Sequence, residues 1–411
     1  RMRVLSSEGA GEARIAWAQA QMPVLEALSG RFAVERPLEG LRVGACLHVT
    51  AETAVLARTL AAGGATVALC AANPLATQDE VVAALAADQA IAVHARHGET
   101  MEELGGHVAD VLDTAPQVTL DDGADLLVTL HGARPDLLDG LIGSTEETST
   151  GLARLRAMEA DGQLRTAVLA VNEARAERVF NDHYGTAQST LDGILRATNL
   201  LLAGRTVVVL GYGATGRGIA HRARGAGAQV IVCEVDPVAG LDARMEGYEV
   251  MPSLDAAARG DIFITVTGAR AVLGAPHFER MKDGAVLANA GHFDVEIDLG
   301  ELREAGGDGQ HVRPLVEQYT LPDGRRLNLL AAGRVVNLAA GEGHPASVMD
   351  LSFALQALSV AHLAGADRQP PGVHPVPEAI DRDVAELKLR TLGVTLDSLT
   401  EAQQEYLRRW R

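Results

Sequence analysis

The chain has 411 residues, of which 47% are hydrophobic and only 3% aromatic, and its formal net charge at pH 7 is −18. This length predicts two domains, and the composition predicts cores made of Ala, Val and Leu rather than aromatic residues. The acidic charge argues against nucleic acid or an anionic membrane as the main partner, because both attract clustered Lys and Arg.

Two stretches of the chain alternate short apolar runs with helical segments. In the first, helical spacing covers residues 1–40 and 50–64, and strands are predicted at residues 42–49, 66–72, 90–95, 118–120 and 126–130. In the second, strands are predicted at residues 207–210, 229–233, 262–268, 285–291 and 334–340, and helices at residues 347–365 and 400–410. This alternation is typical of an α/β protein.

The second stretch opens with a glycine motif that predicts a dinucleotide site. Gly211, Gly213 and Gly216 form G-x-G-x-x-G directly after an apolar run, and Glu234 ends the next predicted strand. The glycines permit a tight turn, a close approach to pyrophosphate at a helix N-terminus, and close helix packing. An acid at Glu234 would accept from the ribose hydroxyls and repel a 2′-phosphate, which favours NAD over NADP. A structural glycine turn without a ligand is the alternative.

We therefore predict a Rossmann-type NAD-binding domain inserted into a discontinuous α/β substrate-binding domain. The NAD-binding domain is placed at residues 186–342, the substrate-binding domain at 1–185 and 343–390, and a helical tail at 391–411. The three cysteines form no C-x-x-C pair, so neither disulfides nor a metal site is expected. With no signal core at the N-terminus and no uncharged run long enough for a membrane span, a cytoplasmic location is expected.

Polar clusters occur where predicted strands or helices meet turns. They lie in "CLHVTAET", "LDDGADL", "STEETSTG" and "VNEARAERVFNDHYGT". Taken singly, each has an ordinary interpretation, such as a structural histidine, a turn or a helix N-cap. Together with an NAD domain, they predict a redox-linked pocket between two domains.

These motifs carry a resemblance to a known family. The chain resembles S-adenosylhomocysteine hydrolases from about Leu41 to Gln356, in "CLHVTAETA", "TLDDGADL", "STEETSTG", "YGTAQSTLDGI", "GYGATGRGIA" and "GEGHPASVMD". The resemblance implies tightly held NAD that transiently oxidises the 3′-hydroxyl of an adenine nucleoside. The ketone acidifies the 4′ hydrogen, so that the 5′ substituent can leave and water can add before the ketone is reduced again. It also implies a homotetramer.

The resemblance assigns roles by motif. His48 and Asp122 are similar to the acid–base pair at the 4′ and 5′ positions, and Glu147 to the carboxylate beside the sugar hydroxyls. Residues similar to those at the base and the substrate mouth are Thr50, Glu52, His344, Met349 and His292. Residues similar to those at NAD are Thr148, Ser149, Thr150, Asp182, Gly211, Gly213, Gly216, Glu234, Asn289 and Asn337, with Ser149 where the family usually has Thr.

Residues 171–186 depart from the family pattern, which reads approximately N-D-x-x-T-K-x-x-F-D-N-x-Y-G. Glu177 stands at the position of the Lys, Asn181 at that of the Asp, and Asp182 at that of the Asn. The ammonium that orients the 3′-hydroxyl is thus replaced by a carboxylate, which could itself serve as a catalytic base.

Two further interpretations concern the same stretch. On a regular helix, Glu173, Glu177 and Asn181 would share one face. A local helix shift could instead bring Arg175 or Arg178 into the pocket as a substitute cation.

Three functions are compatible with these residues. The leading hypothesis is a nucleoside dehydratase of secondary metabolism that removes water to give a 4′,5′-unsaturated nucleoside of the angustmycin type. The alternative is an ordinary adenosylhomocysteinase that hydrolyses S-adenosylhomocysteine to adenosine and homocysteine. A third is an inactive NAD-binding regulatory homologue.

Overall fold

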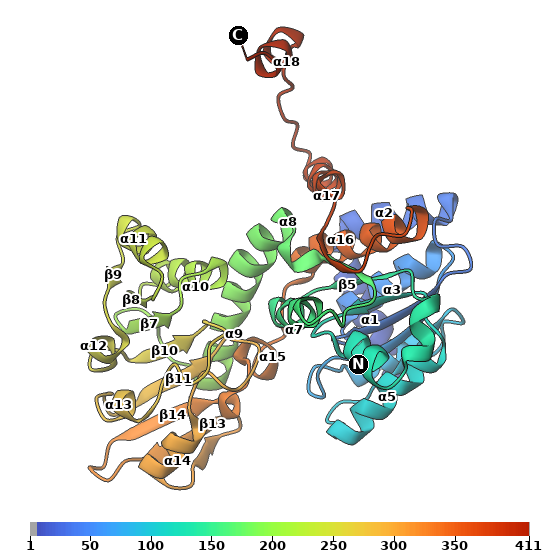
Figure 1. Cartoon of the computed structure of the whole chain (residues 1–411). Coiled ribbons are helices and arrows are strands. Elements are labelled where there is room, and N and C mark those ends of the chain that lie inside the picture. Colours follow the sequence, from blue (N-terminus) through green and yellow to red (C-terminus); the bar gives the residue numbers. More distant parts are fainter. Residues whose placement is uncertain (1–5, 411) are drawn as a thin grey trace, which may run out of the picture.

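The computed structural model describes residues 6–410 and shows two bodies, each built around a mostly parallel sheet (Figure 1). The first sheet has the order β15-β6-β5-β4-β1-β2-β3, and all of its pairings are parallel. Its strands are β1 (Arg42–Leu47), β2 (Thr66–Ala71), β3 (Ile91–His94), β4 (Val118–Asp121), β5 (Gly143–Glu146), β6 (Ala167–Ala170) and β15 (Gly372–Pro375). The predicted α/β fold is therefore confirmed.

Helices from both ends of the chain accompany this sheet. They are α1 (Ser7–Gln19), α2 (Pro23–Glu35), α3 (Ala51–Ala62), α4 (Asp79–Leu85), α5 (Met101–Asp113), α6 (Asp125–Gly132), α7 (Ser149–Ala160), α16 (Ala346–Gly365) and α17 (Glu378–Thr391). Because α16 packs against α2, α3 and β5, the chain returns to the first body after completing the second.

The second sheet has the order β12-β13-β14-β11-β10-β7-β8-β9. Six strands pair in parallel, namely β7 (Thr206–Leu210), β8 (Gln229–Cys233), β9 (Glu249–Val250), β10 (Ile262–Thr265), β11 (Ala285–Asn289) and β14 (Arg326–Leu330). Two antiparallel strands, β12 (Gln310–Arg313) and β13 (Val316–Thr320), complete one edge. The accompanying helices are α9 (Ala187–Thr198), α10 (Ala214–Gly225), α11 (Pro237–Met245), α12 (Ser253–Ala257), α13 (Ala275–Phe278), α14 (Leu299–Gly306) and α15 (Val336–Ala339). We propose that the boundaries between the substrate-binding and NAD-binding domains lie near residues 186 and 343.

Two predicted strands are wrong. Residues 126–130 belong to α6, because the Asp121 carboxylate accepts from the backbone amides of Leu126 and Leu127 at 3.0 and 3.1 Å and so begins a helix. Residues 334–340 contain α15 and contribute only an isolated bridge between Val335 and Asn289. The sheet takes β14 instead, which the sequence pattern did not reveal.

Among residues 6–410, one helix, α16, is long and apolar enough to cross a membrane by length and composition. In this fold 61% of its apolar window is buried, as in the core helix of a globular protein. Asp350 within it pairs with Lys388 at 2.9 Å and accepts from the amides of Val24 and Leu25. These contacts tie α16 to α2 and α17.

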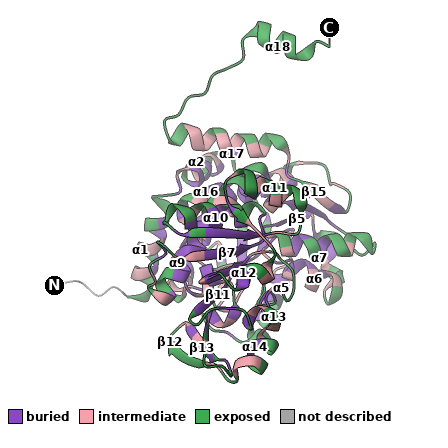
Figure 2. Ribbon diagram, turned by 90° about the vertical axis from the view of Figure 1, so that its left-hand side faces the viewer, coloured by how far each residue is buried: buried purple, intermediate pink, exposed green. Residues whose placement is uncertain are grey.

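The C-terminal helix α18 (Glu401–Arg408) projects away from both bodies (Figure 1). None of its residues is buried, and the segment that connects it to α17 is likewise exposed (Figure 2).

Candidate active site

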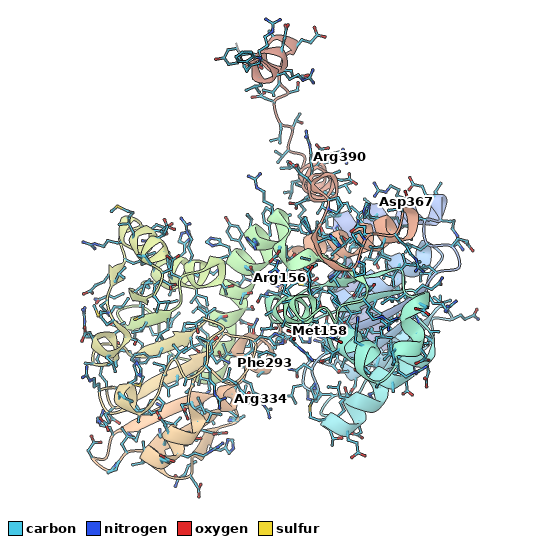
Figure 3. All side chains as sticks on the ribbon, in the orientation of Figure 1. Arg156, Met158, Phe293, Arg334, Asp367 and Arg390 are labelled. Carbon is cyan, nitrogen blue, oxygen red and sulfur yellow. The ribbon has the colours of Figure 1, made fainter. Side chains whose placement is uncertain are left out.

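A cavity of about 350 Å³ lies between the two bodies and brings together most of the predicted site residues. Figure 3 labels Arg156 of α7 and Phe293 of the loop after β11 at the border between the bodies. The predicted residues that line the cavity are His48, Thr50, Glu52, Asp122, Glu147, Thr148, Ser149, Thr150, Glu177, Asn181, Asp182, His292, Asn337, His344 and Met349. We call this cavity the interdomain pocket.

The interdomain pocket is strongly acidic. Its lining includes six carboxyl side chains, those of Glu52, Asp122, Glu147, Glu177, Asp182 and Glu342, and none of its described lining residues is Lys or Arg. Carboxylates gathered where water is scarce disfavour one another's charge.

The first functional pair stands at the carboxyl ends of two adjacent parallel strands. His48 follows β1 and Asp122 follows β4, and these strands pair in register from Val43 to Cys46. The pairing brings His48 Nε2 within 3.3 Å of Asp122 Oδ2, with both side chains largely buried. A histidine and a carboxylate at this distance can pass a proton between them, as acid–base catalysis requires.

A second layer of buried acids fixes the loops that carry Asp122 and Glu147. Asp121 and Glu146 are register partners on β4 and β5. The carboxylate of Asp121 accepts from backbone amides in the first turn of α6. The carboxylate of Glu146 accepts from the amides of Gly123 at 2.9 Å and Thr148 at 3.0 Å. Burial raises the pKa of Asp121 to about 7 and that of Glu146 well above its ordinary value. The sequence signal for this layer is that each strand ends in two consecutive acids.

Glu147 is held by helix α16. The Ser352 hydroxyl donates to one carboxylate oxygen of Glu147, and the Gln356 amide donates to the other. The Gln356 carbonyl in turn accepts from the Thr145 hydroxyl, which fixes the orientation of the amide. Burial raises the pKa of Glu147 to about 7, although the two donors oppose the shift. Sequence reasoning missed Ser352 and Gln356.

The stretch 171–186 is not a regular helix. It forms a 3₁₀ turn (Val171–Glu173), a break at Ala174 with ψ 143°, the short α8 (Arg175–Glu177) and a π-helix (Arg178–Thr186). The expectation that Glu173 shares a face with Glu177 and Asn181 is therefore wrong. Glu173 lies on the other side of the break and pairs with Arg156 at 2.7 Å.

The two arginines of this stretch do not supply a substitute cation. Arg175 is exposed, and the side chain of Arg178 is 58% exposed and lies 3.8 Å from Glu173. Neither lines the interdomain pocket. Glu177 is 1% exposed and faces the pocket, so a buried carboxyl group stands where the described lining contains no Lys or Arg.

The electrostatic environment of Glu177 is unfavourable for a charge. Among the described residues, neither of its carboxyl oxygens has a hydrogen-bond partner. Burial, followed by the charges of Glu147 and Asp182, raises the pKa of Glu177 well above its ordinary value. Burial also raises the pKa of Asp182 to about 6, against the effect of nearby Arg178.

The residues predicted at the base line the pocket from the start of α3 and from residues 344–349. Thr50 is the N-cap of α3, and Glu52 lies in its first turn. His344 Nε2 lies 2.8 Å from the Thr186 hydroxyl, and burial lowers the pKa of His344 to about 4. A neutral histidine here can recognise the edge of a base by hydrogen bonding.

The glycine motif has the geometry that a dinucleotide requires. Gly211 has φ +105°, and a Cβ on Gly216 would lie 2.0 Å from the Gly211 carbonyl oxygen. A Cβ on Gly213 would meet no atom within 4 Å, so this side of the loop is open to a ligand. Glu234 is held beside the loop by the Tyr212 amide at 2.6 Å. These residues fit NAD, whose pyrophosphate would lie at the N-terminus of α10.

The motif glycines, Glu234 and Asn289 do not line the interdomain pocket. Asn289 fixes neighbouring loops through hydrogen bonds to the backbone of Gly291, Phe293 and Gly333. Thr215, in the first turn of α10, does line the pocket and connects the two regions. Sequence reasoning missed Thr215, although it lies between two motif glycines.

Helix α10 packs directly on the π-helix, which leads to a prediction. A Cβ on Gly218 would lie 2.1 Å from the His183 carbonyl oxygen. Gly218→Ala is expected to cost about 1–3 kcal/mol of unfolding free energy and to weaken nucleoside binding by displacing the π-helix. Thermal unfolding and nucleoside titration measure both effects. Gly225→Ala is the control on the same helix, since its Cβ would meet nothing within 4 Å, and an equal loss in both variants would contradict the prediction.

Comparison with known proteins agrees with this geometry. Residues 1–139 match the family described as S-adenosyl-L-homocysteine hydrolase, and residues 182–343 match its NAD binding domain. The A chain of dipicolinate synthase from Bacillus subtilis has a similar fold, with a TM-score of 0.50 at 14% identity over 79% of this chain and 97% of that one.

Full-length relatives are much closer in sequence. S-inosyl-L-homocysteine hydrolase of Methanopyrus kandleri is 54% identical over 97% of this chain and 95% of that protein. The adenosylhomocysteinases of Gloeobacter violaceus and Aquifex aeolicus are 51% and 53% identical, over 100% and 99% of this chain and 96% and 97% of theirs. From its sequence and from the NAD-binding domain that the family shares, the chain belongs to the S-adenosyl-L-homocysteine hydrolase family and uses NAD.

Proposed function

We propose that this enzyme carries out transient 3′-oxidation and 4′,5′-elimination on an adenine nucleoside and releases water to leave a 4′,5′-unsaturated sugar. The observation that carries the proposal is buried Glu177, which faces the interdomain pocket beside Glu147 where the family resemblance places a Lys. Sugar recognition has thus changed, while His48, Asp122 and Glu147 are retained.

The chain's own residues can move every proton that this reaction needs. Bound NAD would accept a hydride from the 3′ carbon and later return it, and Glu147 takes the proton of the 3′-hydroxyl and gives it back when the ketone is reduced. One member of the His48–Asp122 pair removes the 4′ proton, and the electron pair is delocalised onto the 3′ ketone as an enolate. When the electron pair of the enolate forms the 4′,5′ double bond, the 5′ hydroxide leaves. It takes a proton from the other member of the His48–Asp122 pair and is released as water. Nucleoside is thereby converted to unsaturated nucleoside plus water.

The charge of the pocket supports a small uncharged leaving group. Homocysteine carries an α-carboxylate beside its α-ammonium, and the described residues that line the pocket include no Lys or Arg to pair with that carboxylate. Water carries no charge and needs only a proton from the acid–base pair. Repulsion between anions at close range is strong where water is excluded.

Hydrolysis is the second candidate, and the sequence comparisons favour it. Relatives at 51–54% identity are named as hydrolases of S-adenosyl- or S-inosyl-L-homocysteine. The two names differ in the purine base, so both thioethers belong among the substrates to be tested. In this reaction, water would add to the unsaturated intermediate before the ketone is reduced.

One assay separates the two functions. The purified enzyme with NAD is incubated with adenosine, S-adenosylhomocysteine or S-inosylhomocysteine, and the products are identified by mass spectrometry. We expect adenosine to yield a product lighter by one water molecule. If the only products are a nucleoside and homocysteine from either thioether, the dehydratase proposal is wrong and the hydrolase candidate stands.

The assembly and location of the enzyme are also proposals. The family resemblance suggests a homotetramer, and we propose that the enzyme works in the cytoplasm. Size-exclusion chromatography with light scattering measures the first, and cell fractionation the second.

A further inference from the structure

Glu147 and Glu177 both face the interdomain pocket, but their hydrogen-bond donors are distributed unequally. Both carboxyl oxygens of Glu147 accept, one from Ser352 and one from Gln356. Donors to both oxygens stabilise the ionised form of a carboxyl group. Because the Gln356 carbonyl is occupied by Thr145, the amide must present its N–H to Glu147. Of the two, Glu147 is therefore the one whose ionised form is better stabilised, although burial still raises its pKa to about 7.

Glu177 has the opposite surroundings. It is 1% exposed, and neither of its oxygens has a hydrogen-bond partner among the described residues. The charges of Glu147 and Asp182 raise the pKa of Glu177 further. The nearby polar groups of Ser352 and Asn181 offset only part of this rise. An ionised carboxylate in such a place costs several kcal/mol, whereas a protonated one costs far less.

The charged groups on the neighbouring elements do not lower the cost of ionising Glu177. From α16 and α17, Asp350 and Lys388 pair with each other. From α17, Asp381 accepts from the amides of Arg175 and Ala176 at the start of α8. On the π-helix, Arg178 points outward to Glu173. Among the described residues that line the pocket, no Lys or Arg therefore offsets a charge on Glu177.

We propose that Glu177 carries a proton in the working enzyme and donates a hydrogen bond from its carboxyl group to an oxygen of the bound sugar. This inference rests on the proposed function only in placing the sugar beside Glu177. A neutral donor then stands where the family resemblance places a charged Lys. When the 4′ proton leaves, negative charge develops on the 3′ oxygen, and a donor aimed at that oxygen stabilises it. Glu177 keeps its proton throughout and is not a base.

The protonated form donates and the ionised form cannot, which sets the direction of the pH dependence. Burial and two like charges raise the pKa of Glu177. Nucleoside affinity is therefore full below that raised pKa and falls as pH rises through it, by about tenfold per pH unit once the group is ionised. Binding above the pKa is accompanied by proton uptake.

The test measures binding rather than product. Adenosine is titrated into the purified enzyme by calorimetry across neutral and alkaline pH, in buffers with different heats of ionisation, so that proton uptake is measured directly. Glu177→Gln keeps a donor but cannot ionise, and we expect its affinity to be independent of alkaline pH. Glu177→Leu lacks the donor and is expected to bind about 2- to 12-fold more weakly than Glu177→Gln, the value of one neutral hydrogen bond.

Glu173→Gln is the matched control, since Glu173 lies four residues away outside the pocket. It should retain the wild-type pH profile. A wild-type affinity that is unaffected by alkaline pH, or a Glu177→Gln profile that follows the wild type, would overturn the inference. Because binding needs no turnover, failure to find the dehydrated product overturns the proposed function while leaving this result intact.

Discussion

His48→Gln is expected to lower turnover by a factor of about 10²–10⁴ while leaving reduction of NAD by the nucleoside detectable. His48 and Asp122 lie 3.3 Å apart, and the proposed reaction uses them to remove the 4′ proton and to protonate the leaving group. Glutamine can hydrogen-bond to Asp122 but cannot exchange a proton at neutral pH. The elimination therefore stops after the 3′ ketone has formed.

Two measurements check this expectation. Absorbance of NADH after mixing with adenosine reports oxidation, and mass spectrometry reports elimination. Asp122→Asn should show the same separation, because it removes the other half of the pair. His311→Gln, on an exposed side chain of β12, is the control and should behave as the wild type. If His48→Gln eliminates at the wild-type rate, the assignment of His48 is wrong.

Restoring the cation of the family pattern should have the second large effect. Glu177→Lys places an ammonium beside Glu147 in place of a buried carboxyl group. Asn181→Asp gives this ammonium a second carboxylate as a partner. We expect about a hundredfold gain in hydrolysis of S-adenosylhomocysteine, the scale on which an orienting group changes rate. Loss of water from adenosine should fall in the same variant.

Steady-state assays on both substrates provide the measurement. Glu173→Lys introduces the same charge on the same stretch but outside the pocket, so it controls for a general effect of charge. If the double variant hydrolyses S-adenosylhomocysteine no faster than the wild type, the altered pair does not determine the reaction, and the hydrolase candidate gains support.

The sequence was sufficient where a local signal determines local structure. The strands that lead to His48, to Asp122 and to the glycine motif are apolar runs that end at polar residues, and parallel strands bring such ends together. The run at residues 126–130 was misleading, because four apolar residues and a Thr suit a buried strand and a buried helix equally well. What decided the outcome was the Asp121 side chain, which caps α6.

The contacts that determine charge in the pocket could not be predicted from the sequence. Ser352 and Gln356 meet Glu147 across 205 and 209 residues, and no spacing rule covers such distances. The break at Ala174 is equally hidden, since a helical pattern continues through it in the sequence. The presence of Glu177 was visible, but its lack of hydrogen-bond partners was not.

The π-helix determines the direction in which Glu177 faces. Its hydrogen bonds run from residue i to i+5, so each turn encloses one residue more than an α-helical turn. Deleting one residue between Arg178 and Thr186 would restore α-helical turns and rotate the preceding segment by about 100°. Glu177 would then leave the pocket, and α10 would lose its contact at His183. The length of this segment therefore determines whether the side chain of Glu177 faces the pocket.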